Sequence, residues 1–231
     1  MKPINHHPTS QLLQQFADGD LSPALSLAVS AHVDMCPHCQ RALDVAEAEL
    51  AQQWQFKEVS DETVAEQDLT SMPEFAAMFD QITRAEPAAI ETNWESAPTP
   101  LLLGDKEFYL PRALQRFSAQ AGRWRQMGKL SRSSLALEEN VSASFIHIDA
   151  DGQIPEHTHK GVEWTLVLDG SFSDEEGHYQ AGDFIRCDGQ HKHTPRTAMG
   201  EDCLCFAVVE APLHFTSGLS RLLNPFARFM Q

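Results

Sequence analysis

The feature of this sequence that most constrains its fold is the segment VSAHVDMCPHCQRAL, residues 29–43. It places His32, Cys36 and Cys39 four and then three residues apart. Positions with this spacing share one face of a helix, or lie close together where one helix ends and the next begins. Zinc in proteins takes four nitrogen or sulfur ligands in a tetrahedron. The spacing therefore predicts three ligands of a zinc site held by two helical segments.

The residues alone leave the fourth ligand open. His6 and His7 are adjacent in a polar N-terminal segment, and either one could complete the tetrahedron. Four protein ligands would close the site and make it structural rather than catalytic. His38, between the two cysteines, is expected to face solvent. A CxxC pair also occurs in redox proteins, but there it normally accompanies a βαβ pattern, which this sequence lacks. We therefore favour metal binding.

The charge of the chain argues against one class of function. The 231 residues carry a formal net charge of −16, and residues 1–97 contribute −12 of it, with 4 Lys or Arg against 16 Asp or Glu. Nucleic acids are bound mainly through Lys and Arg, so we expect no direct nucleic-acid binding. This charge favours encounter with a basic protein surface, although ordinary solubility explains it equally well.

No segment predicts a membrane-bound or secreted protein. The apolar stretches, such as LSLAVSAHV, are far shorter than the roughly 18–20 residues that cross a bilayer. The segment MKPINHHPTS has no apolar core of the kind found in signal peptides. Five cysteines, an odd number, fit a reducing compartment better than a disulfide framework. We expect a cytoplasmic protein without a membrane partner, and a C-terminal segment, residues 217–231, that packs as an amphipathic tail.

The order of the predicted elements indicates an α+β protein with two domains. Helical spacing of apolar residues, with Ser10, Ser22 and Pro37 as starts, predicts helices over 11–18, 22–35, 37–54 and 72–85. From residue 101 onward, short segments rich in β-branched and aromatic residues predict strands: ASFIHID, EWTLVLDGSFSD, HYQAGDFIRC and CLCFAVVEA. We expect a small helical zinc-binding bundle at residues 1–86, a linker at 87–100 and a β domain at 101–231.

The N-terminal segment resembles a known family. HVDMCPHC is similar to the H-x3-C-x2-C motif of zinc-binding anti-sigma factors, and the surrounding sequence resembles the ChrR type, in which a cupin follows the helical domain. In that type the upstream ligand lies 25 residues before the motif histidine, and here this position is His7. The resemblance implies that His7, His32, Cys36 and Cys39 bind zinc.

The strand region resembles the two sequence motifs of cupins. The first, G-x5-H-x-H-x3,4-E-x6-G, is similar to GQIPEHTHKGVEWTLVLDG, whose first gap is one residue short. The second, G-x5-P-x-G-x2-H-x3-N, is similar to GDFIRCDGQHKHTPRT, in which Asp188, Gln190 and Thr197 replace the proline, the second glycine and the asparagine. The resemblance implies a C-terminal cupin β-barrel of the jelly-roll type.

The cupin resemblance also implies a second metal site. Its ligands would be His157, His159, Glu163 and His193, with His191 as the alternative to His193. The first two histidines are two residues apart, so on a strand their side chains point to the same side. Three imidazoles and a carboxylate suit zinc, iron, manganese or nickel. We therefore expect zinc or another divalent metal in this domain.

Taken together, the two resemblances imply a transcriptional regulator that is not an enzyme. It would be an anti-sigma factor that sequesters an extracytoplasmic-function sigma factor. Its cupin domain would cause release of that sigma factor on oxidative stress, with singlet oxygen or organic hydroperoxides as signals. The alternative is a metal-dependent cupin dioxygenase or isomerase, with the helical zinc domain as an accessory, because the metal in such enzymes keeps positions open for substrate.

Three cysteines of the β region are candidates for sensing an oxidant. Cys203 and Cys205 alternate along one strand and therefore share a face, where they could equally be small core residues. Cys187 precedes His193 by only a few residues. It is the better candidate if its thiol is exposed and partly ionised, because the thiolate is the form that oxidants attack.

Overall fold

The computed structural model describes residues 3–56, 72–85, 99–121, 123–138, 141–210 and 213–215, with the backbone alone at 55–56 and 213–215. The acidic segment 57–71, most of the expected linker and the expected C-terminal tail lie outside the described residues. Contacts between residues divide the chain into two compact units. The first consists of Met1–Leu50 and Pro98–Gln231, and the second consists of Ala51–Ala97.

Three helices open the first unit. Helix α1 (Ser10–Asp18) begins one residue earlier than expected, because Thr9 rather than Ser10 caps it: the Thr9 hydroxyl accepts a hydrogen bond from the Leu12 amide at 3.2 Å. Helix α2 (Pro23–Met35) has Ser22 as its cap and proline in its first turn, as predicted. Helix α3 (Pro37–Phe56) starts directly after Cys36. The two predicted ligand-bearing helical segments are therefore α2 and the first turn of α3.

The second unit contains helix α4 (Pro73–Arg84), which confirms the helix predicted over 72–85. None of its residues is buried among the described part of the chain. Its larger apolar side chains lie on the surface instead, and Phe79 is 60% exposed. Among the described residues, Met78, Phe79 and Ile82 of this helix thus form an exposed apolar stripe rather than a core.

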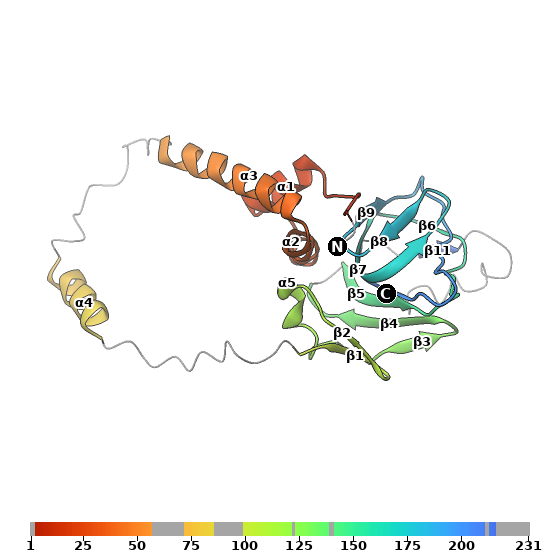
Figure 1. Ribbon diagram of the computed structural model, residues 1–231. Helices are drawn as coiled ribbons and strands as arrows, with labels where there is room; N and C mark the ends of the chain where they lie inside the picture. The colour runs from red at the N-terminus through yellow and green to blue at the C-terminus, as the bar shows by residue number, and fades with distance from the viewer. Residues whose placement is uncertain are drawn as a thin grey trace. The chain divides into compact units, whose positions relative to one another are not determined.

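Strands make up the rest of the first unit, which confirms the prediction of helices followed by strands (Figure 1). They are β1 (Leu101–Leu103), β2 (Lys106–Phe108), β3 (Arg125–Met127), β4 (Leu130–Leu135), β5 (Ser142–Ile148), β6 (His157–His159), β7 (Glu163–Ser173), β8 (His178–Gln180), β9 (Phe184–Cys187), β10 (Cys203–Val209) and β11 (Leu213–Phe215), with a short helix α5 (Arg112–Gln115) after β2.

The largest sheet among the described residues is antiparallel and runs in the order β3-β4-β5-β10-β7-β8, with β9 paired to β7. Strand β6 pairs with β11, and a bridge joins His157 to His193. Strands β1 and β2 form a separate hairpin. We call the region from β1 to β11 the β domain. Its short antiparallel strands agree with the expected jelly-roll architecture.

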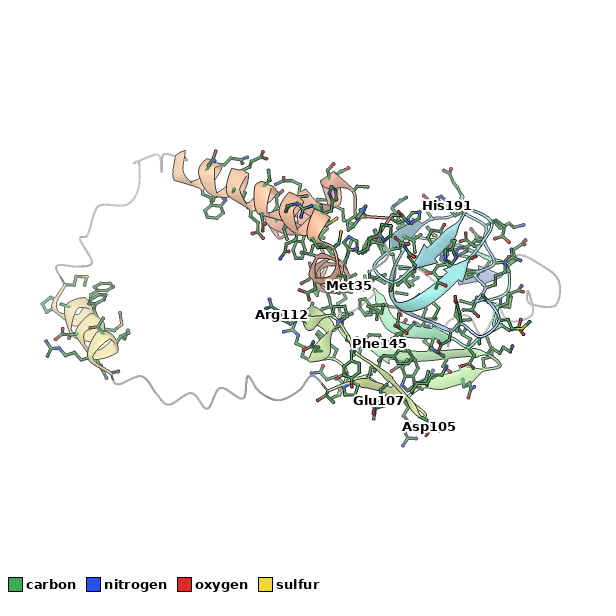
Figure 2. All side chains as sticks on the ribbon, viewed as in Figure 1. Met35, Asp105, Glu107, Arg112, Phe145 and His191 are labelled. Atoms are coloured by element: carbon green, nitrogen blue, oxygen red, sulfur yellow. The ribbon has the colours of Figure 1, made fainter. Side chains whose placement is uncertain are left out.

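Strand β10 is buried on both faces, which explains its run of apolar residues. Leu204, Phe206 and Val208 belong to the main core, which also includes α2. The alternate residues Cys203 and Cys205 pack in a second cluster on the other face. Figure 1 shows α2 next to α5 and the strands of the β domain, and Phe145 of β5, labelled in Figure 2, packs with its ring centroid 5.5 Å from that of Phe206.

Polar contacts also join the helices to the β domain. The Ala24 amide at the start of α2 donates to the Glu138 carboxylate at 2.9 Å. The Ala113 amide of α5 donates to the Asp34 carboxylate, near the end of α2, at 2.8 Å. The helix that carries His32 is therefore hydrogen-bonded to the β domain near both of its ends.

The glycines of the first cupin-like motif lie where a side chain has no space. A Cβ atom on Gly170, which has a φ of 70°, would lie 1.9 Å from the Asp202 carbonyl oxygen. One on Gly152 would lie 2.6 Å from the Asp149 carbonyl oxygen. Thr197, in place of the motif asparagine, accepts from the Gly152 amide at 2.9 Å through its hydroxyl oxygen. The replacement therefore still connects the two motif segments.

Candidate metal centres

The N-terminal cluster consists of four side chains from three segments. The donor atoms of His7, His32, Cys36 and Cys39 all lie within 4.8 Å of one another. His32 lies in the last turn of α2, Cys36 ends that helix, and Cys39 lies in the first turn of α3. His7 Nδ1 is 3.4 Å from the Sγ atom of each cysteine. The turn between α2 and α3 thus brings the H-x3-C-x2-C residues to one point, and the N-terminal segment adds His7.

The hydrogen bonding of His32 leaves one nitrogen free for a metal. Its Nδ1 atom lies 2.8 Å from the Gly182 carbonyl oxygen. Since a carbonyl only accepts, Nδ1 carries the proton and Nε2 keeps its lone pair. Nε2 is buried and has no hydrogen-bond partner among the described residues. Burial lowers the pKa of His32 to about 4, so the imidazole is neutral at pH 7, which is the form that binds metals.

The other two histidines considered for this site lie outside the cluster. His6 Nδ1 is 3.5 Å from the Asp183 carboxylate, and its ring packs edge-on against Tyr179 with centroids 4.9 Å apart. His38 is exposed on α3, as expected for its position between the cysteines. Of the adjacent pair at the N-terminus, the structure therefore brings His7 and not His6 to the cysteines.

A second cluster lies inside the β domain. His157 and His159 come from β6, and His193 comes from the segment bridged to it. The three donor groups lie within 4.8 Å of one another. The Nε2 atom of His193 is 3.0 Å from His157 Nε2 and 3.3 Å from His159 Nε2. Three buried imidazoles therefore converge on a single point through the same ring nitrogen.

Outer contacts orient two of these rings. His157 Nδ1 donates to the Pro155 carbonyl oxygen at 2.9 Å. His193 Nδ1 lies 3.0 Å from the carboxylate of Asp174, whose side chain is only 3% exposed. A carboxylate behind a histidine ligand is a common support of metal sites. Asp174 was missed by the sequence analysis, because it belongs to neither motif and its only signal is a carboxylate in the turn after β7.

Glu163 and His191 lie around this cluster rather than among its three converging nitrogens. Glu163 begins β7, and its carboxylate is 3.2 Å from Nδ1 of His159 and accepts from the Thr165 hydroxyl at 2.8 Å. Burial alone would raise the pKa of Glu163, but the nearby imidazoles of His159 and His157 lower it below its ordinary value. His191, labelled in Figure 2, is 31% exposed, with its Nδ1 2.8 Å from the Asp188 carboxylate.

The cysteines of the β domain are all buried. Cys187 and Cys205 line the same small cavity, of about 40 Å³, as His157 and His193. Burial raises the pKa of Cys187 to about 12, so its thiol is protonated at neutral pH. The condition that a sensing thiol be exposed and partly ionised is therefore not met by Cys187. Cys203 shares a strand face with Cys205, as predicted, and their Sγ atoms are 3.6 Å apart.

Both clusters fit metal ions by their donor chemistry. Two imidazoles and two thiols, with an orphaned buried Nε2 atom among them, match the closed tetrahedral sites of structural zinc. Three imidazoles next to a carboxylate match sites for zinc, iron, manganese or nickel. Among the described residues, no helix is both long and apolar enough to cross a membrane.

Comparison with known proteins places both regions in one family. Residues 115–212 match the ChrR cupin-like domain, and residues 9–40 match a zinc-finger family. The chain is 35% identical over 229 residues to the anti-sigma-E factor ChrR of Cereibacter sphaeroides, which covers 97% of this chain and 99% of that protein. A chain in the crystal structure of Rhodobacter sphaeroides SigE in complex with the anti-sigma ChrR is also similar. It is 27% identical with a TM-score of 0.67, over 90% of this chain and 100% of that one. This protein therefore belongs to the family of the anti-sigma-E factor ChrR.

Proposed function

We propose that this protein is a cytoplasmic anti-sigma factor that binds an extracytoplasmic-function sigma factor. The observation that carries the proposal is the similarity to ChrR over nearly the full length of both chains, helices and β domain together. The solved relative is found in a complex with the sigma factor SigE. The net charge of −12 on residues 1–97 also favours a basic protein surface over nucleic acid as the partner.

The N-terminal helices would hold zinc through His7, His32, Cys36 and Cys39. The match of residues 9–40 to a zinc-finger family and the clustering of the four donors support this assignment. A closed site of this kind stabilises the arrangement of its ligand-bearing segments, since metal binding contributes folding free energy. In this chain it would fix the angle between α2 and α3. We assign the helical zinc-binding domain to residues 1–86 and the linker to 87–100.

The cupin domain, residues 101–231, would hold zinc or another divalent metal through His157, His159, Glu163 and His193, and would respond to oxidative stress. The convergence of the three buried imidazoles supports the metal site. The similarity to an anti-sigma factor extends through the helices, which favours a regulator over the alternative of a cupin dioxygenase or isomerase.

Helix α4 offers an apolar surface for the partner. Met78, Phe79 and Ile82 lie at helical spacing and are all largely exposed among the described residues. An amphipathic helix that buries its apolar stripe in a partner's groove is a common mode of protein recognition. We therefore expect Phe79→Ser to weaken sigma-factor binding by at least tenfold, because a large buried aromatic side chain at an interface contributes about 1.5–3 kcal/mol.

The function is tested by co-expressing the full chain with an extracytoplasmic-function sigma factor from the same genome. Gel filtration should give a stable complex, and sigma-dependent transcription by core RNA polymerase should be inhibited. Cys36→Ser should lose one zinc per chain together with the inhibition, whereas Gln40→Ala, a change of an exposed residue next to Cys39, should keep both. Absence of both complex and inhibition would refute the anti-sigma assignment, and full inhibition by zinc-free Cys36→Ser would show that the metal is not required.

A further inference from the structure

One turn of the β domain is built around the zinc ligands of the N-terminal helices. The turn lies between β8 and β9 and contains Gly182 and Asp183. The Gly182 carbonyl accepts from His32 Nδ1 at 2.8 Å. That hydrogen bond determines which nitrogen of His32 is left to bind the metal. A residue 150 positions away in the sequence, in the other domain, thus sets the tautomer of a zinc ligand.

The same turn holds the segment that carries His7. Asp183 is fully buried, and one of its carboxylate oxygens accepts from the amides of Asn5 at 2.8 Å and His6 at 2.9 Å. In return, the Phe184 amide donates to the His6 carbonyl at 3.0 Å. These three hydrogen bonds fix the backbone directly before His7. The described contacts of this segment therefore come mainly from the β domain and not from the helices.

Packing at this turn leaves little freedom for the N-terminal segment. A Cβ atom on Gly182, where φ is 97°, would lie 2.5 Å from the Ile4 side chain. The ring of Phe184 packs edge-on against His32, with centroids 5.7 Å apart. The positive φ favours glycine at this position and lets Ile4 approach closely, and the aromatic ring limits the orientations open to the imidazole. Hydrogen bonds and packing thus act on both histidines of the cluster.

We propose that Gly182 and Asp183 are positioning residues of the N-terminal zinc site, so that zinc retention by the helical domain depends on the cupin domain. The inference rests on the proposed zinc site. Groups that orient metal ligands typically change metal affinity by about 10- to 100-fold when they are removed. The full chain should therefore lose its N-terminal metal at least tenfold faster when the Asp183 carboxylate is removed.

The test uses the full chain loaded with Co²⁺ in place of zinc. Thiolate-to-cobalt absorption reports the N-terminal site alone, because the proposed cupin ligands contain no thiolate. Loss of this band to excess chelator is timed for Asp183→Ala and for Asp149→Ala, which removes a carboxylate that contacts Lys106 and His147 instead of the N-terminal segment. We expect at least tenfold faster loss for the first variant and an unchanged rate for the second.

A second pair of variants tests the same contact without altering the β domain. Asn5→Pro removes the N–H that donates to Asp183, whereas Asn5→Ala keeps it. Faster loss of cobalt from the proline variant alone supports the proposal. Rates within twofold of the unaltered chain for both Asp183→Ala and Asn5→Pro would overturn it. If the unaltered chain shows no thiolate band at all, the proposed zinc site itself is wrong, which separates the two failures.

Discussion

Replacing Asp174 by asparagine should weaken metal binding in the cupin domain. The carboxylate has one oxygen 3.0 Å from His193 Nδ1, while the other accepts from the amides of Glu176 at 2.9 Å and Gly177 at 3.0 Å. Asparagine has the same shape but only one acceptor oxygen. Whichever way its amide is turned, an NH₂ group faces either the imidazole N–H or the two backbone N–H groups. At least one hydrogen-bonded contact is therefore lost.

The expected size of the effect follows from the kind of bond that is lost. A hydrogen bond to a charged group is worth about 1.5–3 kcal/mol and one between neutral groups about 0.5–1.5 kcal/mol. Complete loss of the charge-assisted bond corresponds to about a 10- to 150-fold change, which agrees with the roughly 10- to 100-fold loss of affinity seen when a partner of a metal-bound histidine is removed. We expect Asp174→Asn to lower the zinc affinity of the cupin site within this range, because His193 Nε2 can bind the metal only while Nδ1 keeps its proton.

The assay is a zinc competition against a chromophoric chelator, on chains whose N-terminal site is already filled. The second equivalent of zinc then reports the cupin site. Asp188→Asn is the control for Asp174→Asn, because Asp188 makes the same kinds of contact with another histidine. Its carboxylate lies 2.8 Å from Nδ1 of His191 and accepts a hydrogen bond from the backbone amide two residues later. An affinity within twofold of the unaltered chain for Asp174→Asn would refute the reasoning. A loss confined to Asp188→Asn would make His191 the ligand instead of His193.

Three further outcomes are expected. As the pH falls from 6.5 to 4, the metal-free chain should lose unfolding free energy, and His32 should account for about 2.5 kcal/mol of the loss, because its pKa is about 4 when folded and 6.5 when unfolded, so the unfolded state binds the extra proton. His157, whose pKa burial also lowers to about 4, should add a loss of similar size. Denaturant titrations check this, and His32→Gln should lose about 2.5 kcal/mol less than the unaltered chain over the same pH range. Gly170→Ala should destabilise the protein by about 2–5 kcal/mol, and Gly200→Ala by about 1–2 kcal/mol. Both residues have a positive φ, but only at Gly170 would the new Cβ atom meet a neighbour, the Asp202 carbonyl. Equal effects of the two changes in thermal melts would show that the close contact relaxes. Ala28→Leu should cost about 1–3 kcal/mol in the same melts, since this α2 residue is fully buried against the β domain.

The sequence was informative wherever neighbouring residues share one element. His32, Cys36 and Cys39 lie close together because a helix ends between them, and this follows from their spacing alone. The alternation along β10 predicted that Cys203 and Cys205 share a face. Local periodicity contains this information, because a helix or a strand fixes the direction of each side chain relative to its neighbours.

Contacts between distant segments were not predictable in the same way. The spacing left His6 and His7 equivalent, and the resemblance to a family rather than any local pattern indicated His7. The structure separates the two because the β8–β9 turn holds the His6 backbone, with the His6 ring against Tyr179, while His7 faces the cysteines. Asp174 was missed for a similar reason. It lies in a turn, where no helical or strand periodicity relates it to His193, the histidine that it contacts.

Gly182 shows most directly why a motif that describes one domain cannot describe its contacts with another. In the cupin-like motif it is a turn glycine, and its φ of 97° is sufficient reason for that residue type. The structure adds a second requirement, because Ile4 of the N-terminal segment leaves no space for a side chain there and the Gly182 carbonyl accepts from a zinc-cluster histidine. Strand β9 starts beside this turn and ends at Cys187, in the cavity lined by His157 and His193. A strand only four residues long therefore links the surroundings of the two histidine clusters, which are more than a hundred residues apart in the sequence.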